Sequence, residues 1–253
     1  MARMNRIHIG VGGWTFAPWR DNFYPKGLPH KQELHYASRQ LTAIEINGTF
    51  YSTFKPDHYA KWRDETPEGF RFALKAHRFS THRKDLATAA EPIARFVGSG
   101  IAELRDRLGP VVWQLMPSTP FARENIEAFF KLLPREVAGR PLQHVLEPRH
   151  ASFVCEEYVD LARRHGVATV HADSDKYPAI ADPETPLAYL RLMRAEPRRA
   201  TGYAPAEIGQ WAQGAQAWVG RGPEREVYAF FISGAKERNP SAAMEMIRRL
   251  RGS

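Results

Sequence analysis

The chain has 253 residues, of which 43% are hydrophobic and 25% charged, with a net charge of +8 at pH 7. No apolar run approaches the roughly 18 residues that a membrane helix needs, and the single cysteine, Cys155, excludes an internal disulfide. These values favour a cytoplasmic globular protein that does not enter a membrane, and the basic balance favours anionic partners. The start, Met1 to Arg6, does not continue into the apolar stretch of a secretory signal.

Apolar runs typical of buried strands alternate with helix-like stretches along the whole chain. Strands are predicted at 7–13, 42–47, 70–76, 111–115, 142–147, 167–172, 187–192 and 227–232. Helices are predicted at 32–40, 57–65, 89–108, 123–133, 156–165, 205–219 and 241–250. The segment between the sixth and seventh strands, rich in Pro and Asp, shows no clear helical period.

Eight such units in about 250 residues match the usual size of a TIM-type barrel. We therefore expect an α/β protein with one closed (β/α)8 barrel domain over residues 1–253. An open doubly wound sheet is the main alternative. It is disfavoured because Gly10 and Gly12 are followed by Thr15, where the dinucleotide-binding fingerprint needs a third glycine.

Polar residues close the predicted strands and alternate with the buried side chains. Glu45 and Asn47 end the second strand, and Lys75 and His77 end the third. Because successive strand side chains point to opposite faces, the members of each pair should point the same way, into the barrel. The same reasoning predicts convergence of the residues that end later strands, namely Gln114, Glu147, Arg149, His171, Asp173 and Arg191. Loops after the strands build the active sites of TIM barrels, so one site is expected at that rim.

Glu45 and Glu147 are the candidate catalytic acid and base, on opposite sides of the predicted lumen. A carboxylic acid with a raised pKa and an ionised carboxylate divide acid and base work in many enzymes. An equally weighted alternative is that each carboxylate holds a buried arginine or lysine in an ion pair.

Lys75 is the third catalytic candidate. A lysine near the end of an apolar strand is desolvated, which lowers its pKa and suits an anion clamp or a Schiff-base nucleophile. A salt bridge to Glu45 is the structural alternative. The clamp and the salt bridge are favoured over the covalent role, because no feature of the sequence indicates a carbonyl substrate. His77 would face the same way and suits proton transfer near neutral pH.

Three further groups of residues bear on ligands. Oxygen and nitrogen donors that suit a divalent ion occur at Glu45, Glu147, His150, His171 and Asp173, but their spacing matches no closed metal motif. We expect no cofactor and keep a divalent metal as the less favoured alternative. Arg191, Arg194 and the turn Ser233 to Lys236 occupy places where barrel enzymes often hold phosphate.

Aromatic residues gather in the first two long loops, at Trp14, Phe16, Trp19, Phe23, Tyr24, Phe50, Tyr51 and Phe54. Packing as a lid over the rim is favoured over stacking on a sugar or a base. Trp14 and Tyr51 lie close enough to strand ends to touch a ligand.

Several motifs occur together in this chain, among them Gly12-Gly13-Trp14, Glu45-Ile46-Asn47-Gly48-Thr49-Phe50-Tyr51, Thr66-Pro67-Glu68-Gly69-Phe70 and Glu147-Pro148-Arg149-His150. The sequence resembles the YecE-like family, also called domain of unknown function 72, most specifically over its first third. The resemblance implies an eightfold barrel and no settled activity. After the seventh strand the family pattern Arg-x-His-Gly is replaced by Arg191-Leu192-Met193-Arg194, and after the eighth Phe-x-Asn is replaced by Phe231-Ile232-Ser233. Chemistry that needs that histidine or asparagine is therefore not implied here.

Together these features predict an enzyme of hydrolase or isomerase type that acts on a small anionic or sugar-like molecule by acid–base chemistry. Lys75, Arg149 and Arg191 would hold negative charge. The remaining substrate-binding candidates are Trp14, Asn47, Tyr51, His77, Gln114, His150 and Asp173. Two alternatives stay open, a nucleic-acid binding or processing protein and a catalytically silent ligand-binding barrel. The oligomeric state is not predicted.

Overall fold

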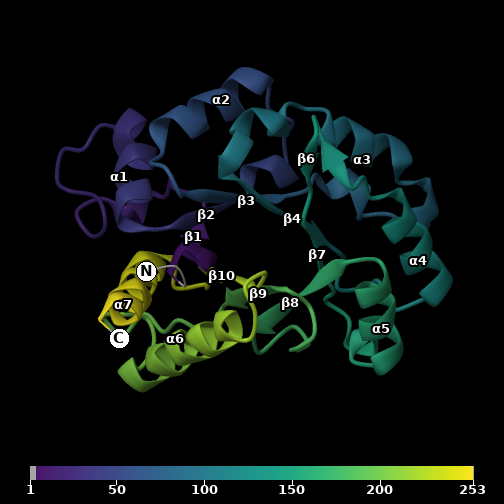
Figure 1. Ribbon diagram of the computed structural model, residues 1–253. Coiled ribbons are helices and arrows are strands. Elements are labelled where there is room, and N and C mark those ends of the chain that lie inside the picture. The colour runs from purple at the N-terminus through teal and green to yellow at the C-terminus, as the bar shows by residue number, and fades with distance from the viewer. Residues whose placement is uncertain (1–3, 253) are drawn as a thin grey trace.

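Eight parallel strands close into a barrel in this computed structural model, which describes residues 4–252. The order around the ring is β1-β10-β9-β8-β7-β4-β3-β2, with each strand paired to the next. The bounds are β1 (Ile7–Gly12), β2 (Ala43–Ile46), β3 (Arg71–Lys75), β4 (Leu108–Gln114), β7 (His144–Glu147), β8 (Val167–Asp173), β9 (Leu187–Leu192) and β10 (Glu226–Phe231). The predicted TIM-type barrel is confirmed (Figure 1).

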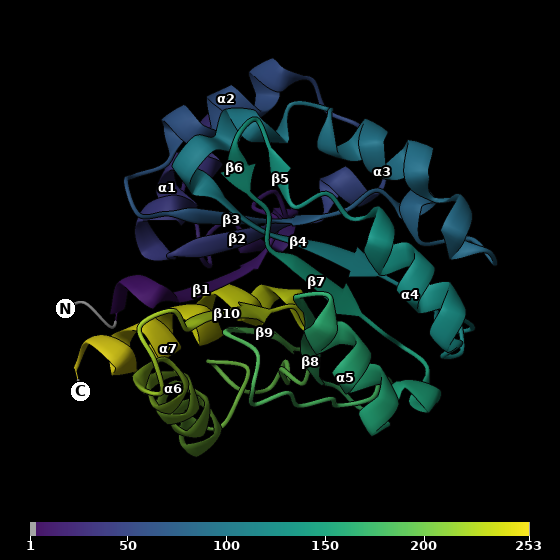
Figure 2. The ribbon, with the colours of Figure 1, turned by 45° about the vertical axis from the view of Figure 1, so that its right-hand side comes forward.

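Seven α-helices of the described chain surround the ring, as Figures 1 and 2 show. They are α1 (Glu33–Gln40), α2 (Pro56–Glu65), α3 (Ala90–Val97), α4 (Arg123–Leu132), α5 (Glu156–Arg164), α6 (Pro205–Gly220) and α7 (Asn239–Arg251). Short 3-10 helices occupy the connections, at η1 (Met4–Arg6), η2 (Ala17–Trp19), η3 (His30–Gln32), η4 (Gly48–Phe50), η5 (Arg78–Ser80), η6 (Leu86–Thr88), η7 (Ile101–Arg107), η8 (Ala151–Phe153) and η9 (Lys236–Arg238). None of the described helices is long and apolar enough to cross a membrane.

Two elements differ from the sequence prediction. The helix expected at 89–108 is divided into α3 and η7, because Gly100 between them has a φ of 113°, which ends a right-handed helix. A two-stranded antiparallel hairpin, β5 (Glu136–Val137) and β6 (Arg140–Pro141), was not predicted. Its strands are only two residues long, and such short strands carry too little hydrophobic alternation to be recognised.

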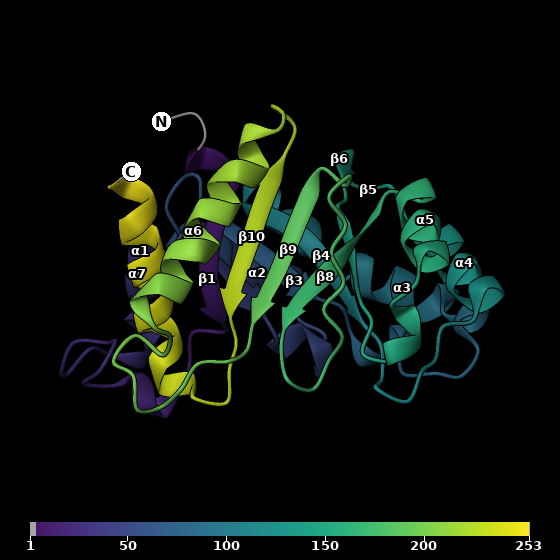
Figure 3. The same ribbon diagram turned by 90° about the horizontal axis from the view of Figure 1, so that it is seen from below.

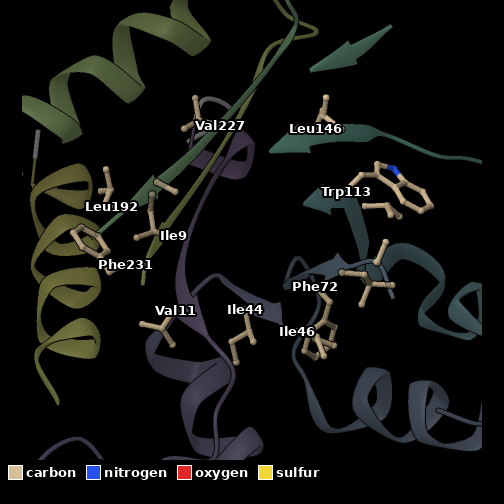
Figure 4. Close-up of a cluster of buried hydrophobic side chains, with 14 of the residues drawn as sticks. Ile9, Val11, Ile44, Ile46, Phe72, Trp113, Leu146, Leu192, Val227 and Phe231 are labelled. Atoms are coloured by element: carbon tan, nitrogen blue, oxygen red, sulfur yellow. The ribbon is translucent and has the colours of Figure 1, made fainter. Parts of the chain in front are cut away.

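Strand parity divides the core into an inner and an outer layer. The inner layer fills the lumen with Ala43, Ala73, Val112, Val145, Ala168, Val170, Leu187, Tyr189, Tyr228 and Phe230. The outer layer packs between strands and helices, and Figure 4 shows part of it, including Ile44, Phe72, Trp113, Leu146 and Phe231. A residue two positions beyond an inner-layer residue on the same strand therefore also faces the lumen.

The strand pair β1 and β2 fits together only because Gly10 has no side chain. A Cβ atom at Gly10 would lie 1.8 Å from the carbonyl oxygen of Ala43, on the neighbouring strand. That distance is far inside van der Waals contact, so any larger residue would force the two strands apart. Closure of the ring at this point depends on this glycine.

The connection between β8 and β9 contains no helix, as predicted. In Figure 3, β9 and β8 lie between α6 and α5 with no helix across them. Trp211 and Trp218 of α6 line a pocket of about 220 Å³ with Leu190 and His171 on the outer face of these strands. The barrel wall is therefore less covered here than elsewhere.

Candidate functional site

Five side chains from five strands converge at the carboxyl-terminal mouth of the barrel. Glu45, Lys75, Gln114, Glu147 and Arg191 are all buried, with exposed fractions between 0% and 7%. Each lies two positions beyond an inner-layer residue on its own strand, which directs it into the lumen. The structure thus brings together the predicted candidates from β2, β3, β4, β7 and β9.

Arg191 bridges the two carboxylates across the lumen. Its Nη1 donates to both oxygens of Glu147, at 2.7 and 2.8 Å, and its Nη2 donates to Oε1 of Glu45 at 3.0 Å. The hydroxyl of Tyr189 donates to the second oxygen of Glu45 at 2.7 Å. The guanidinium fork suits such planar pairing, and each carboxylate oxygen of the two residues has a donor.

Arg149 completes the cluster on the solvent side of Glu147. Its Nε and Nη2 donate to Glu147 Oε1 at 3.1 and 3.0 Å, and its Nη1 donates to the hydroxyl of Tyr177 at 3.2 Å. Burial alone would raise the pKa of Glu147, but the charges of Arg191 and Arg149 outweigh it and hold this pKa below its ordinary value. The buried ion pair with arginine, one of the two expected alternatives, is what the structure shows for both carboxylates.

Lys75 has no such partner. Within residues 4–252 no carboxylate oxygen lies within 4 Å of its Nζ, so the alternative salt bridge to Glu45 is wrong. The ammonium group instead lies 4.3 Å from the centre of the Phe50 ring. Burial, followed by the charge of Arg191, lowers the pKa of Lys75 from 10.5 to about 8. Arg191 occupies the carboxylates that would otherwise neutralise this lysine.

Neighbouring loops hold the mouth in shape, and two buried polar atoms of the site, Gln114 Oε1 and Arg191 Nε, have no hydrogen-bond partner among the described residues. Thr49 donates its hydroxyl to the Lys75 carbonyl at 2.7 Å, and Thr81 donates to the Gln114 carbonyl at 2.6 Å. The side-chain oxygen of Gln114 is buried and finds no hydrogen-bond donor among the described residues. A buried acceptor without a protein partner beside an unpaired ammonium suits the binding of a polar ligand.

Asn47 and His77 lie at the edge of this mouth. A Cβ atom on Gly12 would come within 2.7 Å of the Asn47 amide nitrogen, so Asn47 lies over the end of β1. His77 accepts a hydrogen bond from the backbone of Phe79 at 3.3 Å, and burial lowers its pKa from the ordinary value. Tyr51, in the loop after β2, is 64% exposed at the same edge.

The predicted convergence of His171 and Asp173 on the lumen is wrong. Val170 belongs to the inner layer, so the next residue, His171, faces outward, where its ring lies 6.0 Å from that of Trp211. Asp173 has the same parity and forms an ion pair of 3.3 Å with Arg194. The residues of a regular strand divide into two alternating sets, one on each face. The prediction chose the set that faces outward.

Two other candidates serve local packing. Trp14 packs edge-on against Trp62 of α2 and beside the outward-facing Phe72, which places it outside the lumen. His150 accepts a hydrogen bond from the backbone of Ser152 at 3.2 Å and so caps η8.

The remaining ligand candidates do not assemble into a second centre. Of the candidate metal donors, Glu45 and Glu147 meet at Arg191 and the others lie apart, and no group of three or more His, Cys, Asp or Glu side chains in residues 4–252 is placed to hold a metal ion. In the turn after β10, the Ser233 hydroxyl is engaged with the Asn239 side chain at 2.6 Å.

Three residues of the site were missed from the sequence. Tyr189 lies two positions before Arg191, and the parity that selected the arginine would have indicated this tyrosine. Phe50 was assigned to a lid and instead supports the ammonium of Lys75. Tyr177, whose ring lies 4.2 Å from the Arg149 guanidinium, belongs to the irregular segment after β8, where no periodicity could indicate its position.

The fold and the site define a (β/α)8 barrel with a buried arginine–carboxylate cluster and a free lysine at its carboxyl-terminal mouth. The chain belongs to the family described as "Protein of unknown function DUF72", whose model matches residues 8–253. This confirms the resemblance to the YecE-like proteins.

Named relatives and solved structures agree. The chain is 29% identical to the UPF0759 protein YecE of Escherichia coli strain K12 over 175 residues, which cover 66% of this chain and 59% of that protein. It is 32% identical to YunF of Bacillus subtilis strain 168 over 75 residues, which cover 30% of this chain and 26% of that one. A DUF72 family structure from Thermotoga maritima superposes with a TM-score of 0.74 at 22% identity, over 98% of this chain and 99% of that one. Another, from Enterococcus faecalis, gives 0.72 at 17% identity, over 98% and 96%. At these identities the structures support the fold alone.

Proposed function

We propose that the mouth of the barrel binds a small anionic ligand, a phosphate or a carboxylate, between Lys75 and Arg149. In this proposal the protein is an acid–base enzyme of hydrolase or isomerase type in which Lys75 transfers the proton. The observation that carries the proposal is the Lys75 ammonium group, which is buried but has no carboxylate partner. A desolvated cation of this kind is costly unless an anion neutralises it in the working state.

The charges of the cluster support an anionic ligand. The cations Lys75, Arg149 and Arg191 face the carboxylates Glu45 and Glu147, which leaves one positive charge in excess when Lys75 is protonated. Coulombic interactions are strong in such a poorly hydrated site, so a single phosphate or carboxylate would be attracted to it.

The hydrogen bonds shift the acid–base role from the carboxylates to Lys75. Glu147 receives bonds from two arginines and its pKa is lowered, so it is a poor proton donor near neutral pH. Glu45 has both oxygens engaged by Arg191 and Tyr189. Lys75, with a pKa of about 8, can exist in both protonation states near neutral pH, which general catalysis requires. The carboxylates would then act as positioning residues that fix Arg191.

Calorimetric titration with inorganic phosphate and with malonate tests the binding step. The wild-type chain and Lys75→Met are compared, with Lys26→Met as a control that removes an exposed lysine. We expect Lys75→Met to weaken binding at least about tenfold, the value of a hydrogen bond to a charged group. Wild-type affinity should fall as the pH rises through about 8, where Lys75 loses its charge. Equal affinity of the wild type and Lys75→Met for both anions would refute the proposal.

A catalytically silent anion-binding barrel is the second candidate. It is favoured by the full engagement of both carboxylates and by Met193 and Ser233 at positions where the family pattern has a histidine and an asparagine. A screen of phosphate esters and hydroxy acids separates the two functions. Turnover whose pH profile shows an apparent pKa near 8 and that disappears in Lys75→Met supports the enzyme, whereas anion binding without turnover supports the silent barrel.

A further inference from the structure

Two aromatic side chains stand exposed at the mouth of the barrel. Tyr51 is 64% exposed and Phe79 is 57% exposed, and with Val154 they are the large hydrophobic side chains with the greatest exposure in residues 4–252. Both follow strands that end in site residues, Tyr51 after β2 and Phe79 after β3. Burial would stabilise the fold by removing such rings from water, so their exposure beside the site is typical of a ligand-contacting surface.

Ring contacts join Tyr51 to Lys75, and His77 connects Phe79 to the backbone of Tyr51. The Lys75 ammonium lies 4.3 Å from the centre of the Phe50 ring, and that ring packs edge-on against Tyr51 at 5.0 Å. The His77 ring packs edge-on against Phe79, with ring centres 4.7 Å apart, and interacts with the backbone of Tyr51. Tyr51 is therefore two contacts from the free cation, and Phe79 is held next to His77.

The loop after β3 adds positive charge to the same edge. The Arg78 guanidinium lies 5.6 Å from the centre of the Phe79 ring. Arg83 and Lys84 follow in the sequence. The acidic residue nearest in sequence, Asp85, uses its side chain to accept a hydrogen bond from the backbone of Ala87. The edge therefore combines cations with aromatic faces.

From this juxtaposition we infer that the ligand is a nucleotide unit, with a phosphate group at Lys75 and a planar base stacked on Tyr51 or Phe79. The inference rests on the proposed anion site and adds the second half of the ligand. Cationic grooves with exposed aromatic rings bind nucleotides without regard to base identity, because every base presents an aromatic face. The unit has two sources, a free nucleotide or a single strand of nucleic acid.

Titration with inorganic phosphate, ribose 5-phosphate, adenosine 5′-monophosphate and a ten-residue oligothymidylate tests the inference. We expect the nucleotide to bind about tenfold more tightly than ribose 5-phosphate, as for one stacked base. The double substitution of Tyr51→Ala and Phe79→Ala should abolish this difference and leave the affinity for ribose 5-phosphate unchanged. Val154→Ala, which removes another exposed apolar side chain, should change neither affinity.

The outcomes test the base site separately from the anion site on which it rests. If the nucleotide and ribose 5-phosphate bind equally, and both still depend on Lys75, the inferred base site is refuted and the anion site stands. If neither ligand depends on Lys75, the anion site itself is refuted. Oligonucleotide affinity that exceeds nucleotide affinity and falls steeply with salt identifies a nucleic-acid strand as the source, and affinity no greater than that of the nucleotide identifies a free nucleotide.

Discussion

Replacing Lys75 with methionine should stabilise the fold, and the gain should depend on pH. The pKa of this lysine falls from 10.5 in the unfolded chain to about 8 in the native barrel. Between these values the unfolded chain binds more protons, so the free energy of unfolding of the wild type rises with pH across this window. The cost of holding Lys75 protonated is fully present below about pH 8 and disappears above about pH 10.5.

The magnitude follows from the shift. A difference of this size corresponds to about 3 kcal/mol at pH 7 and about 1 kcal/mol at pH 9.5, at 1.36 kcal/mol for each pKa unit. The variant also loses the contact between the ammonium and Phe50, worth roughly 1 kcal/mol at pH 7, where the lysine is charged, and close to nothing at pH 9.5, where it is mostly neutral. We therefore expect Lys75→Met to be more stable than the wild type by about 2 kcal/mol at pH 7, and this advantage to shrink by about 1 kcal/mol at pH 9.5.

Urea unfolding of the wild type, Lys75→Met and Lys26→Met at both pH values measures this difference. Lys26 is exposed, so its substitution should leave the stability unchanged within about 0.5 kcal/mol at each pH. Two results would show that the lysine is neutralised in the free protein. Either Lys75→Met is no more stable than the wild type at pH 7, or its stability advantage is the same at pH 7 and pH 9.5. The basis of the anion site would then be lost.

Three further substitutions test the cluster and the ring closure. Glu147→Gln leaves two arginines without their carboxylate and should lower the free energy of unfolding by about 3–5 kcal/mol at pH 7. Because the pKa of Glu147 is lowered in the fold, this deficit should shrink as the pH falls below 4.5, which acid titration of urea midpoints would detect. Tyr189→Phe removes a 2.7 Å hydrogen bond to the Glu45 carboxylate and should cost about 2–3 kcal/mol by thermal unfolding. The control Tyr158→Phe, whose hydroxyl bonds a neutral threonine, should cost about 1 kcal/mol. Equal losses for the two variants would contradict the stronger, charged hydrogen bond. Gly10→Ala should abolish soluble folding, whereas Gly214→Ala, with open space in α6, should gain up to about 1 kcal/mol, and circular dichroism melts compare them.

Strong periodic signals were enough to predict the barrel. All eight strands were predicted from apolar runs, because the strands of a parallel sheet covered on both faces have nearly continuous hydrophobic sequences. The absence of a helix between β8 and β9 was also visible, because that segment lacks a helical period. The hairpin of β5 and β6 was invisible, since its pairing depends on a tight turn at Ala138 and Gly139.

On β2 and β7 the inward-facing residues were predicted correctly, whereas on β8 the outward-facing residues were chosen. For Glu45 and Glu147 the inward direction followed from the strand ends, but the partner that bridges both, Arg191, lies far away in sequence and meets them only in the closed ring. His171 and Asp173 alternate just as regularly, and nothing in their segment indicates which face is the lumen. Which of two equally regular faces turns inward is decided by tertiary packing.

The sector between α5 and α6, where no helix covers β8 and β9, should be the least stable part of the barrel wall. β8 and β9 are backed by an irregular segment and by a pocket beside Trp211 and Trp218. Local opening should begin at this join, so backbone amides of β9 should exchange with deuterium sooner than those of β3. Because Arg191 lies on β9, each such opening would also break its hydrogen bonds to both buried glutamates. Local opening of the barrel wall would therefore change the charge balance at the mouth.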